Sequence, residues 1–204
     1  MRGKILNVAS ASLDKMRANQ EIQDLILALG GGSGRDFSSD KLRYERVIIM
    51  TDADVDGAHI ASLLMTFFFR EMPRLVDNGH LYLALPPLYR LTQGNETQYA
   101  RDDAHREELM QTTFNGRGKV EVSRFKGLGE MPARYLWATT MDPGQRTVLR
   151  VKLPSRDEAD ETIETAAEAL ARTAQLVETL MGRRPELRFD YIQKNARFAR
   201  DLDV

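Results

Sequence analysis

Apolar residues near the start of the chain recur at mostly helical spacing. They lie between positions 13 and 29 and stop at the glycine run 30–32, and they are Leu13, Met16, Ile22, Leu25, Ile26 and Leu29. This pattern predicts one helix over 13–29, followed by a flexible loop. No Gly-Lys-Ser/Thr ending follows the glycines and no strand precedes them, so we interpret the run as a hinge and not as a phosphate loop.

A short apolar and β-branched run, 47–50, is bounded by charged residues and predicts a buried strand of a parallel sheet. An acidic segment, 51–57, follows it directly. Apolar residues then return at helical spacing over 59–76, and the pattern ends at Asn78-Gly79. Pro73 marks a kink or an early end of this helix. The predicted unit is therefore strand, acidic loop, helix.

Alternating and periodic segments continue downstream of this unit. Residues 80–91 and 96–100 are predicted to be strands around an Asn-containing turn, and 102–111 a short helix. Residues 119–125 form another alternating strand that runs directly into Lys126-Gly127-Leu128-Gly129. The sequence thus mixes strands and helices, which favours the α/β class.

The last region is predicted to be helical. Ser155 and Glu158 have the spacing of a capping box, in which the two side chains satisfy free backbone donors at a helix start. An apolar stripe follows at steps of mostly three and four residues up to Gly182, formed by Ile163, Ala167, Leu170, Ala174, Val177 and Met181. A helix with one apolar stripe must pack against another surface.

The charge of the chain is balanced overall but unevenly placed. The formal net charge is -1, and from Ser155 onward there are 8 basic and 11 acidic residues. A uniformly basic surface is therefore excluded, and a site for a polyanion is expected before Pro154. With 204 residues, 42% of them hydrophobic, the chain is long enough to bury a core.

The composition also excludes several kinds of chemistry. There is no cysteine, so disulfides, thiolate metal sites and cysteine nucleophiles are ruled out. The longest apolar stretch, 60–69, is far shorter than the roughly 20 residues that span a bilayer. No signal peptide is recognisable at the N-terminus. We expect no membrane contact and a cytoplasmic location.

Three carboxylates, Asp52, Asp54 and Asp56, stand at alternate positions directly after the predicted strand. Left unpaired near an apolar core, they would repel one another, so a cation is expected beside them. Oxygen ligands favour magnesium, manganese or calcium over zinc or copper. The alternative is a solvated acidic turn in which one of these aspartates caps the following helix.

Two other families share parts of this acidic pattern. An EF-hand calcium loop that began at Asp52 would need a glutamate at its twelfth position, where this sequence has Leu63, and a helix where residues 47–50 predict a strand. We reject that reading. A haloacid-dehalogenase-like phosphotransferase also places Asp-x-Asp after a strand, with Asp52 as nucleophile, but it favours Thr or Val at the position of Asp56. It remains the enzymatic alternative.

Four stretches, in the same order along the chain, resemble one family. Residues 49–60, with Thr-Asp-Ala-Asp-Val-Asp-Gly-Ala-His, resemble the Toprim signature of the B subunits of bacterial type IIA DNA topoisomerases, gyrase and topoisomerase IV. Residues 2–7 (Arg-Gly-Lys-Ile-Leu-Asn), 124–131 (Arg-Phe-Lys-Gly-Leu-Gly-Glu-Met) and 139–143 (Thr-Thr-Met-Asp-Pro) resemble its further motifs. The segment 180–189 is more similar to topoisomerase IV, and the long insert of some gyrases is missing.

The resemblance implies a fold and a division into domains. We expect an α/β, Toprim-type (Rossmann-like) parallel sheet with flanking helices over 1–153 and a C-terminal helical tail over 154–204. In the family a glutamate lies in a Glu-Gly-Asp-Ser-Ala segment upstream of Arg-Gly-Lys. This chain begins at Met1-Arg2-Gly3-Lys4, so we expect the N-terminal strand with the Toprim glutamate, and the ATPase and transducer domains, to be missing.

The resemblance also implies an activity, in which an ATP-driven enzyme passes one DNA duplex through a transient break in another. The nucleophilic tyrosine would belong to the A subunit, and Mg²⁺ would lie beside the scissile phosphate, with Mn²⁺ or Ca²⁺ able to substitute in binding. Asp52 and Asp54 would be the principal metal ligands and Asp56 a supporting one. Six further residues would contact DNA: Arg2, Lys4, Asn7, His59, Arg124 and Lys126.

The implied partners are DNA and the A subunit of topoisomerase IV, in a heterotetramer on which the C-terminal tail would dock. ATP would bind only through the missing N-terminal domain, so the chain by itself is expected to be catalytically inert. A departure from the family pattern is Pro132-Ala133, where Asn usually follows the Met, and it leaves the geometry of the DNA-contacting loop open. A non-catalytic metal-binding module is the alternative from another functional class.

Overall fold

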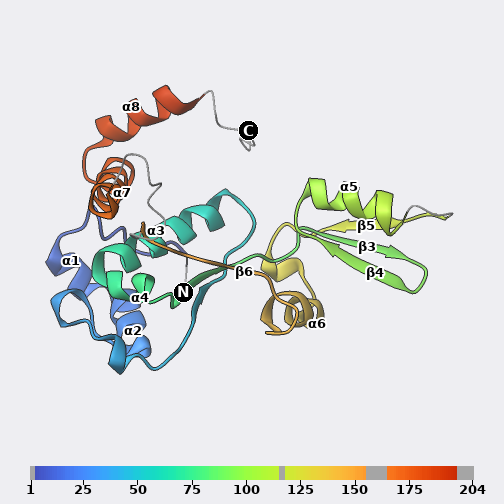
Figure 1. The fold of residues 1–204 in the computed structure, drawn as a ribbon, viewed down its shortest axis with the longest axis horizontal. Helices are drawn as coiled ribbons and strands as arrows, with labels where there is room; N and C mark the ends of the chain where they lie inside the picture. Colours follow the sequence, from blue (N-terminus) through green and yellow to red (C-terminus); the bar gives the residue numbers. More distant parts are fainter. Residues whose placement is uncertain (1–2, 115–117, 155–164, 197–204) are drawn as a thin grey trace. The chain divides into compact units, whose positions relative to one another are not determined.

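The computed structural model describes residues 3–114, 118–154 and 165–196 (Figure 1). The chain divides into two compact units. Unit 1 draws its residues from 1–47, 62–81 and 151–204, and unit 2 from 48–61 and 82–150. The helical tail is therefore grouped with the N-terminal segment.

Unit 1 is mainly helical. Its elements are α1 (Leu13–Ala18), α2 (Gln20–Leu29), the 3-10 turns η1 (Gly34–Asp36) and η2 (Ser39–Lys41), most of α3 (Val55–Glu71), α4 (Pro73–Asp77), α7 (Ala166–Met181) and α8 (Pro185–Asn195). The side chains that are almost completely excluded from solvent include Ile22, Phe67, Phe68, Met72, Leu75 and Leu81. The rings of Phe67 and Phe68 meet edge to face with centroids 5.2 Å apart, a favourable aromatic geometry.

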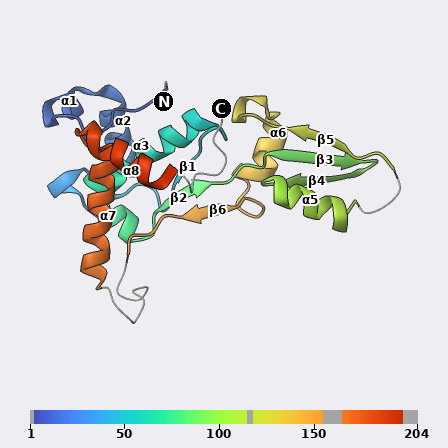
Figure 2. The ribbon, with the colours of Figure 1, turned by 90° about the horizontal axis from the view of Figure 1, so that it is seen from above.

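Two small sheets accompany the helices. One has the strand order β1-β2-β6 and contains β1 (Val47–Ile49), β2 (Leu81–Ala84) and β6 (Val148–Arg150) (Figure 2). β1 and β2 are joined by the helical crossover α3–α4, the kind of connection that parallel neighbours require. β2 and β6 pair antiparallel. The α/β class with flanking helices is confirmed, although this sheet includes an antiparallel pair.

The second sheet belongs to unit 2 and has the order β4-β3-β5. Its strands are β3 (Tyr89–Gln93), β4 (Glu96–Ala100) and β5 (Glu121–Arg124), and α5 (Asp103–Thr112) lies along one face (Figure 1). Both strand pairs are antiparallel. Between this sheet and α5 lies a small core that contains Tyr89, Leu91, Ala100 and Phe114.

The remaining elements of unit 2 follow β5. They are the 3-10 turn η3 (Leu128–Glu130), α6 (Ala133–Leu136) and a π-helical turn, η4 (Trp137–Met141). The sequence analysis found none of these three elements, nor β6. Each is five residues or shorter, which is too short for periodicity to identify.

The helix predicted over 13–29 is in fact two helices. Asn19 has an extended backbone, and its side-chain oxygen accepts a hydrogen bond of 3.0 Å from the backbone N–H of Ile22. It is thus the N-cap of α2 and ends α1, because an N-cap residue cannot continue the preceding helix. The predicted end at Gly30 is confirmed, and this glycine has the left-handed conformation (φ 79°) typical of a C-cap.

The predicted break at Pro73 is confirmed. α3 ends at Glu71, and α4 begins with Pro73 in its first turn, where the missing N–H of proline costs nothing. The strand predicted over 80–91 is divided into β2 and β3, with Pro86 and Pro87 between them, because proline cannot donate to a strand ladder.

The C-terminal helix ends at Gly182 as predicted. Its predicted start, with Ser155 and Glu158, lies outside the described residues. The structure places a complete capping box at Thr165 and Glu168, so α7 itself begins at Ala166. None of the helices among the described residues has the length and apolar character needed to cross a membrane.

Candidate functional site

The acidic loop, residues 51–54, connects β1 to α3. The side chains of Asp52, Asp54 and Asp56 are all exposed, and all three residues belong to unit 2. Asp56 lies in the first turn of α3. The predicted order of strand, acidic loop and helix is therefore confirmed, and the carboxylates lie where a ligand in solvent can reach them.

Asp54 caps α3. Its Oδ1 accepts a hydrogen bond of 2.6 Å from the backbone N–H of Gly57, and its carbonyl accepts one of 2.9 Å from Ala58. A carboxylate in this position satisfies a free backbone donor and interacts favourably with the helix dipole. Helix capping, which the sequence analysis considered as an alternative to metal binding, thus accounts for one oxygen of Asp54.

Gly57 allows the first turn of α3 to pack against the backbone of Asp52. A Cβ atom at position 57 would overlap the carbonyl oxygen of Asp52. The glycine that ends the Asp-x-Asp-x-Asp-Gly pattern is therefore needed for steric reasons, which the sequence analysis did not identify.

Asp52 is held by a loop that lies 76 positions further along the chain. Its Oδ1 accepts a hydrogen bond of 2.8 Å from the backbone N–H of Leu128. Gly127 lies against the same carboxylate, and a Cβ atom there would be 3.1 Å from Cγ and Oδ1 of Asp52. The bond joins the acidic loop to the segment 126–130, which we call the glycine loop. Two stretches that the sequence analysis singled out separately are thus brought together.

The glycine loop is shaped by Glu130. Its Oε2 accepts a hydrogen bond of 2.9 Å from the backbone N–H of Lys126, and its own backbone N–H donates to the carbonyl of Gly127. The side chain of Lys126 is exposed. The sequence analysis gave no role to Glu130 or Leu128. The motif contained them, but a backbone contact leaves no signal in residue type.

The acidic loop offers a small set of oxygen donors. Within the described residues no group of three or more His, Cys, Asp or Glu side chains is arranged to hold a metal ion. Oδ2 of Asp52 accepts no hydrogen bond from the part of the chain that the structure describes, so this oxygen remains available to a cation. Carboxylate oxygens in small number suit magnesium, which keeps several waters and uses substrate phosphate to complete its shell.

The predicted DNA-contacting residues lie in both units. In unit 2, His59 lies on α3, Arg124 ends β5 and Lys126 lies in the glycine loop, and all three are exposed. In unit 1, Lys4 is exposed. Arg2 lies outside the described residues. A role in DNA binding stays a prediction for each of these residues.

Asn7 makes two hydrogen bonds within unit 1. Its Nδ2 donates to the carbonyl of Met181 at 2.8 Å, and its Oδ1 accepts from the backbone N–H of Ala9 at 3.0 Å. The side chain therefore fastens the N-terminal segment to the end of α7. This contact was not foreseen, and the DNA contact expected for Asn7 stays a prediction.

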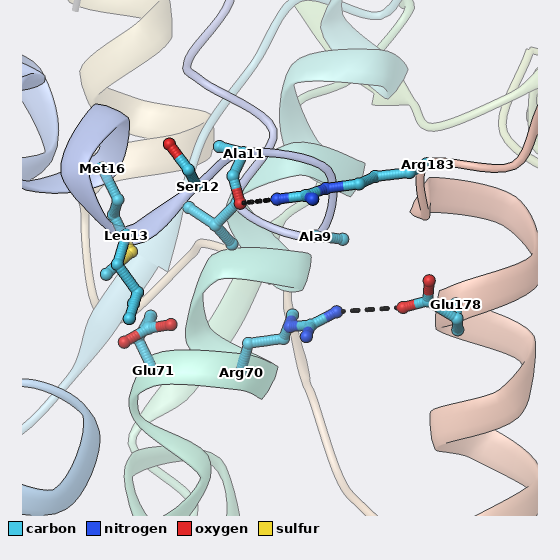
Figure 3. Close-up of a pocket in the computed structure, with 10 residues that line it drawn as sticks. Ala9, Ala11, Ser12, Leu13, Met16, Arg70, Glu71, Glu178 and Arg183 are labelled. Atoms are coloured by element: carbon cyan, nitrogen blue, oxygen red, sulfur yellow. Dashed lines mark hydrogen bonds and ion pairs between the residues drawn. The ribbon is translucent and has the colours of Figure 1, made fainter.

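Two arginines attach the tail to the rest of unit 1. Figure 3 shows Arg183 beside Ala11 and Arg70 beside Glu178. Arg183 donates to the carbonyls of Ser10 and Ala11 at 2.8 and 3.1 Å. Arg70 on α3 forms an ion pair of 3.2 Å with Glu178 on α7. These polar contacts hold the tail within unit 1, but Leu170 of the predicted apolar stripe is 41% exposed, so the packing of that stripe stays a prediction.

These contacts border a cavity of about 490 Å³ in unit 1 (Figure 3). Two arginines and two glutamates line it together with apolar side chains from the segment 8–16, and one of the glutamates is Glu71. Burial raises the pKa of the Glu71 carboxyl above its ordinary value, while the neighbouring Arg70 acts in the opposite direction. The charges of this cavity are balanced, so it has no preference for an anion.

Comparison with known proteins gives two family matches. The model of the Toprim domain matches residues 1–85, and that of the DNA gyrase B subunit, carboxyl terminus, matches residues 117–193. Together they include both the acidic loop and the glycine loop.

Individual relatives match the whole chain. It is 60% identical to the B subunit of DNA topoisomerase 4 of Caulobacter vibrioides and 57% identical to that of Bartonella bacilliformis, and it covers 28% of each. It is 50% identical to the B subunit of DNA gyrase of Halalkalibacterium halodurans and covers 30% of it. The chain thus spans less than a third of the length of these relatives. With both domain models and these identities, the chain belongs to the family of B subunits of DNA topoisomerase IV and DNA gyrase, of which it contains the Toprim part.

Proposed function

We propose that this chain holds Mg²⁺ and contacts DNA at the cleavage and religation site of a type IIA topoisomerase of the topoisomerase IV kind. The observation that carries the proposal is the hydrogen bond from the backbone of Leu128 to Asp52. It unites a carboxylate suited to a cation with a glycine-rich, lysine-bearing loop suited to a phosphate. The names of the relatives, which are B subunits of DNA topoisomerase 4 and of DNA gyrase, support it.

Each carboxylate has a defined part in this proposal. Asp52 would present Oδ2 to the cation while Leu128 holds Oδ1. Asp54 would present its second oxygen while Oδ1 caps α3, and Asp56 would support them. When bound, Mg²⁺ stabilises negative charge on the phosphate and on the leaving oxygen, so this chain needs no nucleophile of its own.

The basic residues would contact the phosphate backbone. Lys126 is exposed and flanked by Gly127, so DNA can approach the loop closely. Arg2, Lys4, His59 and Arg124 would contribute in the same way. Such contacts are electrostatic and largely independent of base sequence.

The reaction as a whole would be carried out by a larger assembly. The nucleophilic tyrosine would come from the A subunit in a heterotetramer, and ATP would be bound by another part of the B subunit. The assembly would relax and decatenate DNA in the cytoplasm. The haloacid-dehalogenase-like alternative loses its basis, because the chain belongs to another family.

The metal site is tested in the full-length heterotetramer with Asp52→Asn. We expect DNA cleavage to be lost while ATP hydrolysis continues, because the substitution removes a metal ligand and nothing from the ATP site. Asp77→Asn, at an exposed acid of α4, is the matched control and should cleave normally. Normal cleavage by Asp52→Asn would overturn the proposal.

The metal should bind weakly to the isolated chain. Few carboxylates are available, and magnesium completes its shell with waters and substrate phosphate. Calorimetric titration with Mg²⁺ in the absence of DNA should therefore show little heat, and a tight site would contradict the proposed ligand set.

The phosphate contacts are tested by Lys126→Ala in the heterotetramer. Cleavage should fall in the same proportion at every DNA site, and the dependence of binding on salt should fall by nearly one unit of slope per contact. Loss at particular base sequences only would show that this side chain reads bases.

Mixing the chain with a topoisomerase IV A subunit separates the proposal from the alternative of a metal-binding module without partners. Such a module would not co-elute with the A subunit.

A further inference from the structure

The face of the β4-β3-β5 sheet opposite α5 carries one arginine and one tyrosine that lie side by side, Arg90 and Tyr99. Residues of β3 alternate between the two faces, so Tyr89 and Leu91 point into the core beneath α5 and Arg90 points to the opposite face. Arg90 is paired in register with Tyr99 on β4 and with Ser123 on β5. The centre of this polar face is therefore a cation beside an aromatic ring.

Helix α6 adds a second cation and a second ring. The guanidinium carbons of Arg90 and Arg134 both lie 4.7 Å from the ring centroid of Tyr135. The rings of Tyr99 and Tyr135 are 6.2 Å apart. We call these four residues, Arg90, Tyr99, Arg134 and Tyr135, the arginine–tyrosine cluster. It lies entirely within unit 2.

Two guanidinium groups near one ring repel each other, and the electron-rich ring offsets this repulsion only in part. Among the described residues, neither Arg90 nor Arg134 forms an ion pair with a carboxylate. Arg90 uses Nε to bond Thr92 at 3.2 Å, and Arg134 uses Nη2 to bond the hydroxyl of Tyr135 at 2.8 Å. Other donors of both guanidinium forks remain for an anion, and the geometry of such forks matches phosphate oxygens.

The surroundings of the cluster also favour an anion. Tyr99 also lines a cavity of about 610 Å³, within the usual range for ligand sites. Its lining among the described residues contains Arg101, His105 and several neutral hydrogen-bonding side chains, but no carboxylate. Burial raises the pKa of the Tyr99 phenol above its ordinary value, and the charges of Arg90 and Arg134 act in the opposite direction. With the arginines of the cluster, Arg101 in the cavity and no carboxylate in the described lining, this face is cationic.

Pro132, where the sequence departs from the family pattern, lies at the start of the helix that carries the second arginine and the second tyrosine of the cluster. Pro132 is the N-cap of α6, and its carbonyl accepts hydrogen bonds from the backbone N–H groups of Tyr135 and Leu136, at 2.8 and 3.1 Å. The short helix that begins here carries both Arg134 and Tyr135. The residue that the sequence analysis could not interpret thus starts the element that completes the cluster.

We propose that the arginine–tyrosine cluster, with the adjoining cavity at Tyr99, is a second phosphate-binding surface, which binds the backbone of duplex DNA outside the acidic loop. It goes beyond the proposed function, because neither Asp52 nor the glycine loop takes part in it. The guanidinium forks and the neutral donors match the oxygens of a phosphate backbone, and the lining of the adjoining cavity holds no carboxylate among the described residues that would repel it.

The test measures binding of a labelled DNA duplex of mixed sequence to the 204-residue chain by fluorescence anisotropy at several salt concentrations, with EDTA present to remove metal ions. The double variant Arg90→Gln/Arg134→Gln should bind more weakly and show a salt slope lower by about one unit for each arginine. Arg17→Gln, at an exposed arginine of α1, removes the same charge elsewhere and should leave the slope unchanged.

Two variants of Tyr135 test how the cations are held. Tyr135→Phe keeps the ring and should bind DNA nearly as well as the parent chain, whereas Tyr135→Leu removes the ring and should weaken binding. Each variant is first shown to have the circular dichroism spectrum and Tm of the parent chain. Arg134→Gln alone, at an exposed position, provides the test should the double variant unfold.

An unchanged salt slope in the arginine variants would overturn the proposal. Arginine variants that bind DNA like the parent chain but no longer co-elute with an A subunit would also overturn it, and would indicate a protein-docking surface instead. If Asp52→Asn has normal cleavage while the arginine variants bind weakly, the proposed function fails and the phosphate-binding surface stands.

Discussion

The side-chain amide of Asn7 donates a hydrogen bond of 2.8 Å to the carbonyl of Met181. Met181 is the last residue of α7, where carbonyl groups lack partners within the helix. Arg188 satisfies neighbouring carbonyls, those of Leu180 and Gly182, at 2.6 and 3.3 Å. The end of α7 is thus closed by side chains from both ends of the sequence.

Asn7→Ala should therefore destabilise unit 1. It removes two hydrogen bonds to backbone groups, which corresponds to about 1–2 kcal/mol and lowers Tm by a few degrees. Differential scanning calorimetry measures the shift. Gln175→Ala, at an exposed position of α7, is the control and should leave Tm nearly unchanged. Equal Tm values for the two variants would mean that the Asn7 contact does not hold the tail.

Gly127→Ala should displace the Asp52 carboxylate. The new Cβ would lie 3.1 Å from Cγ and Oδ1 of Asp52, so the carboxylate must move by a few tenths of an ångström. We expect metal-dependent DNA cleavage in the heterotetramer to fall, while the Tm of the chain changes little.

Gly129→Ala is a matched control for this substitution in the same loop. A Cβ atom at Gly129 would have no neighbour within 4 Å. Cleavage by Gly129→Ala should therefore remain close to that of the parent enzyme. Equal effects of the two substitutions would indicate a general change in the loop and would contradict the steric account.

Substitutions of Asp54 can separate its capping from its proposed metal binding. Asp54→Ala should lower stability by about 1 kcal/mol, because the bond to the N–H of Gly57 is lost. Asp54→Ser keeps a capping oxygen and should restore most of that stability. If Asp54 also binds the metal, DNA cleavage should be lost in both variants. Recovery of cleavage in Asp54→Ser would leave capping as the only role of this side chain.

The capping box of α7 should make stability depend on pH. Glu168 Oε2 accepts hydrogen bonds from the backbone N–H and the hydroxyl of Thr165, at 2.8 and 2.9 Å, and the backbone bond is the main cause that lowers the pKa of Glu168 below 4.5. A lowered pKa contributes stability that is fully present above the unfolded value and is lost as the pH falls through the folded value.

Melting curves of the parent chain and Glu168→Gln measure this contribution. The parent should have the higher Tm above pH 4.5, because only the charged carboxylate makes the stronger hydrogen bonds. The difference should shrink as the pH falls further and Glu168 becomes protonated. A difference that stays constant down to the lowest pH would show that the charge does not contribute.

Local patterns were enough for the elements that carry their own signals. Val47 to Ile49 form the predicted strand, in keeping with the preference of β-branched residues for strands. Pro73 cannot continue the interior of α3 and begins a new helix instead, and Gly30 ends a helix by adopting a left-handed conformation. The signal of Asn19 as a cap was present in the sequence, but the apolar spacing on both sides of it concealed the break.

The sequence by itself determined which residues could bind a cation or a phosphate, because the chemistry of Asp52 or Lys126 belongs to the side chain. Only the tertiary structure decided what lies beside them. The partner of Asp52 is a backbone N–H at Leu128, and that of Asn7 is a carbonyl at Met181. Every residue has a backbone carbonyl and all but proline have an N–H, so residue type cannot reveal such partners, and only the path of the folded chain brings them within hydrogen-bonding distance.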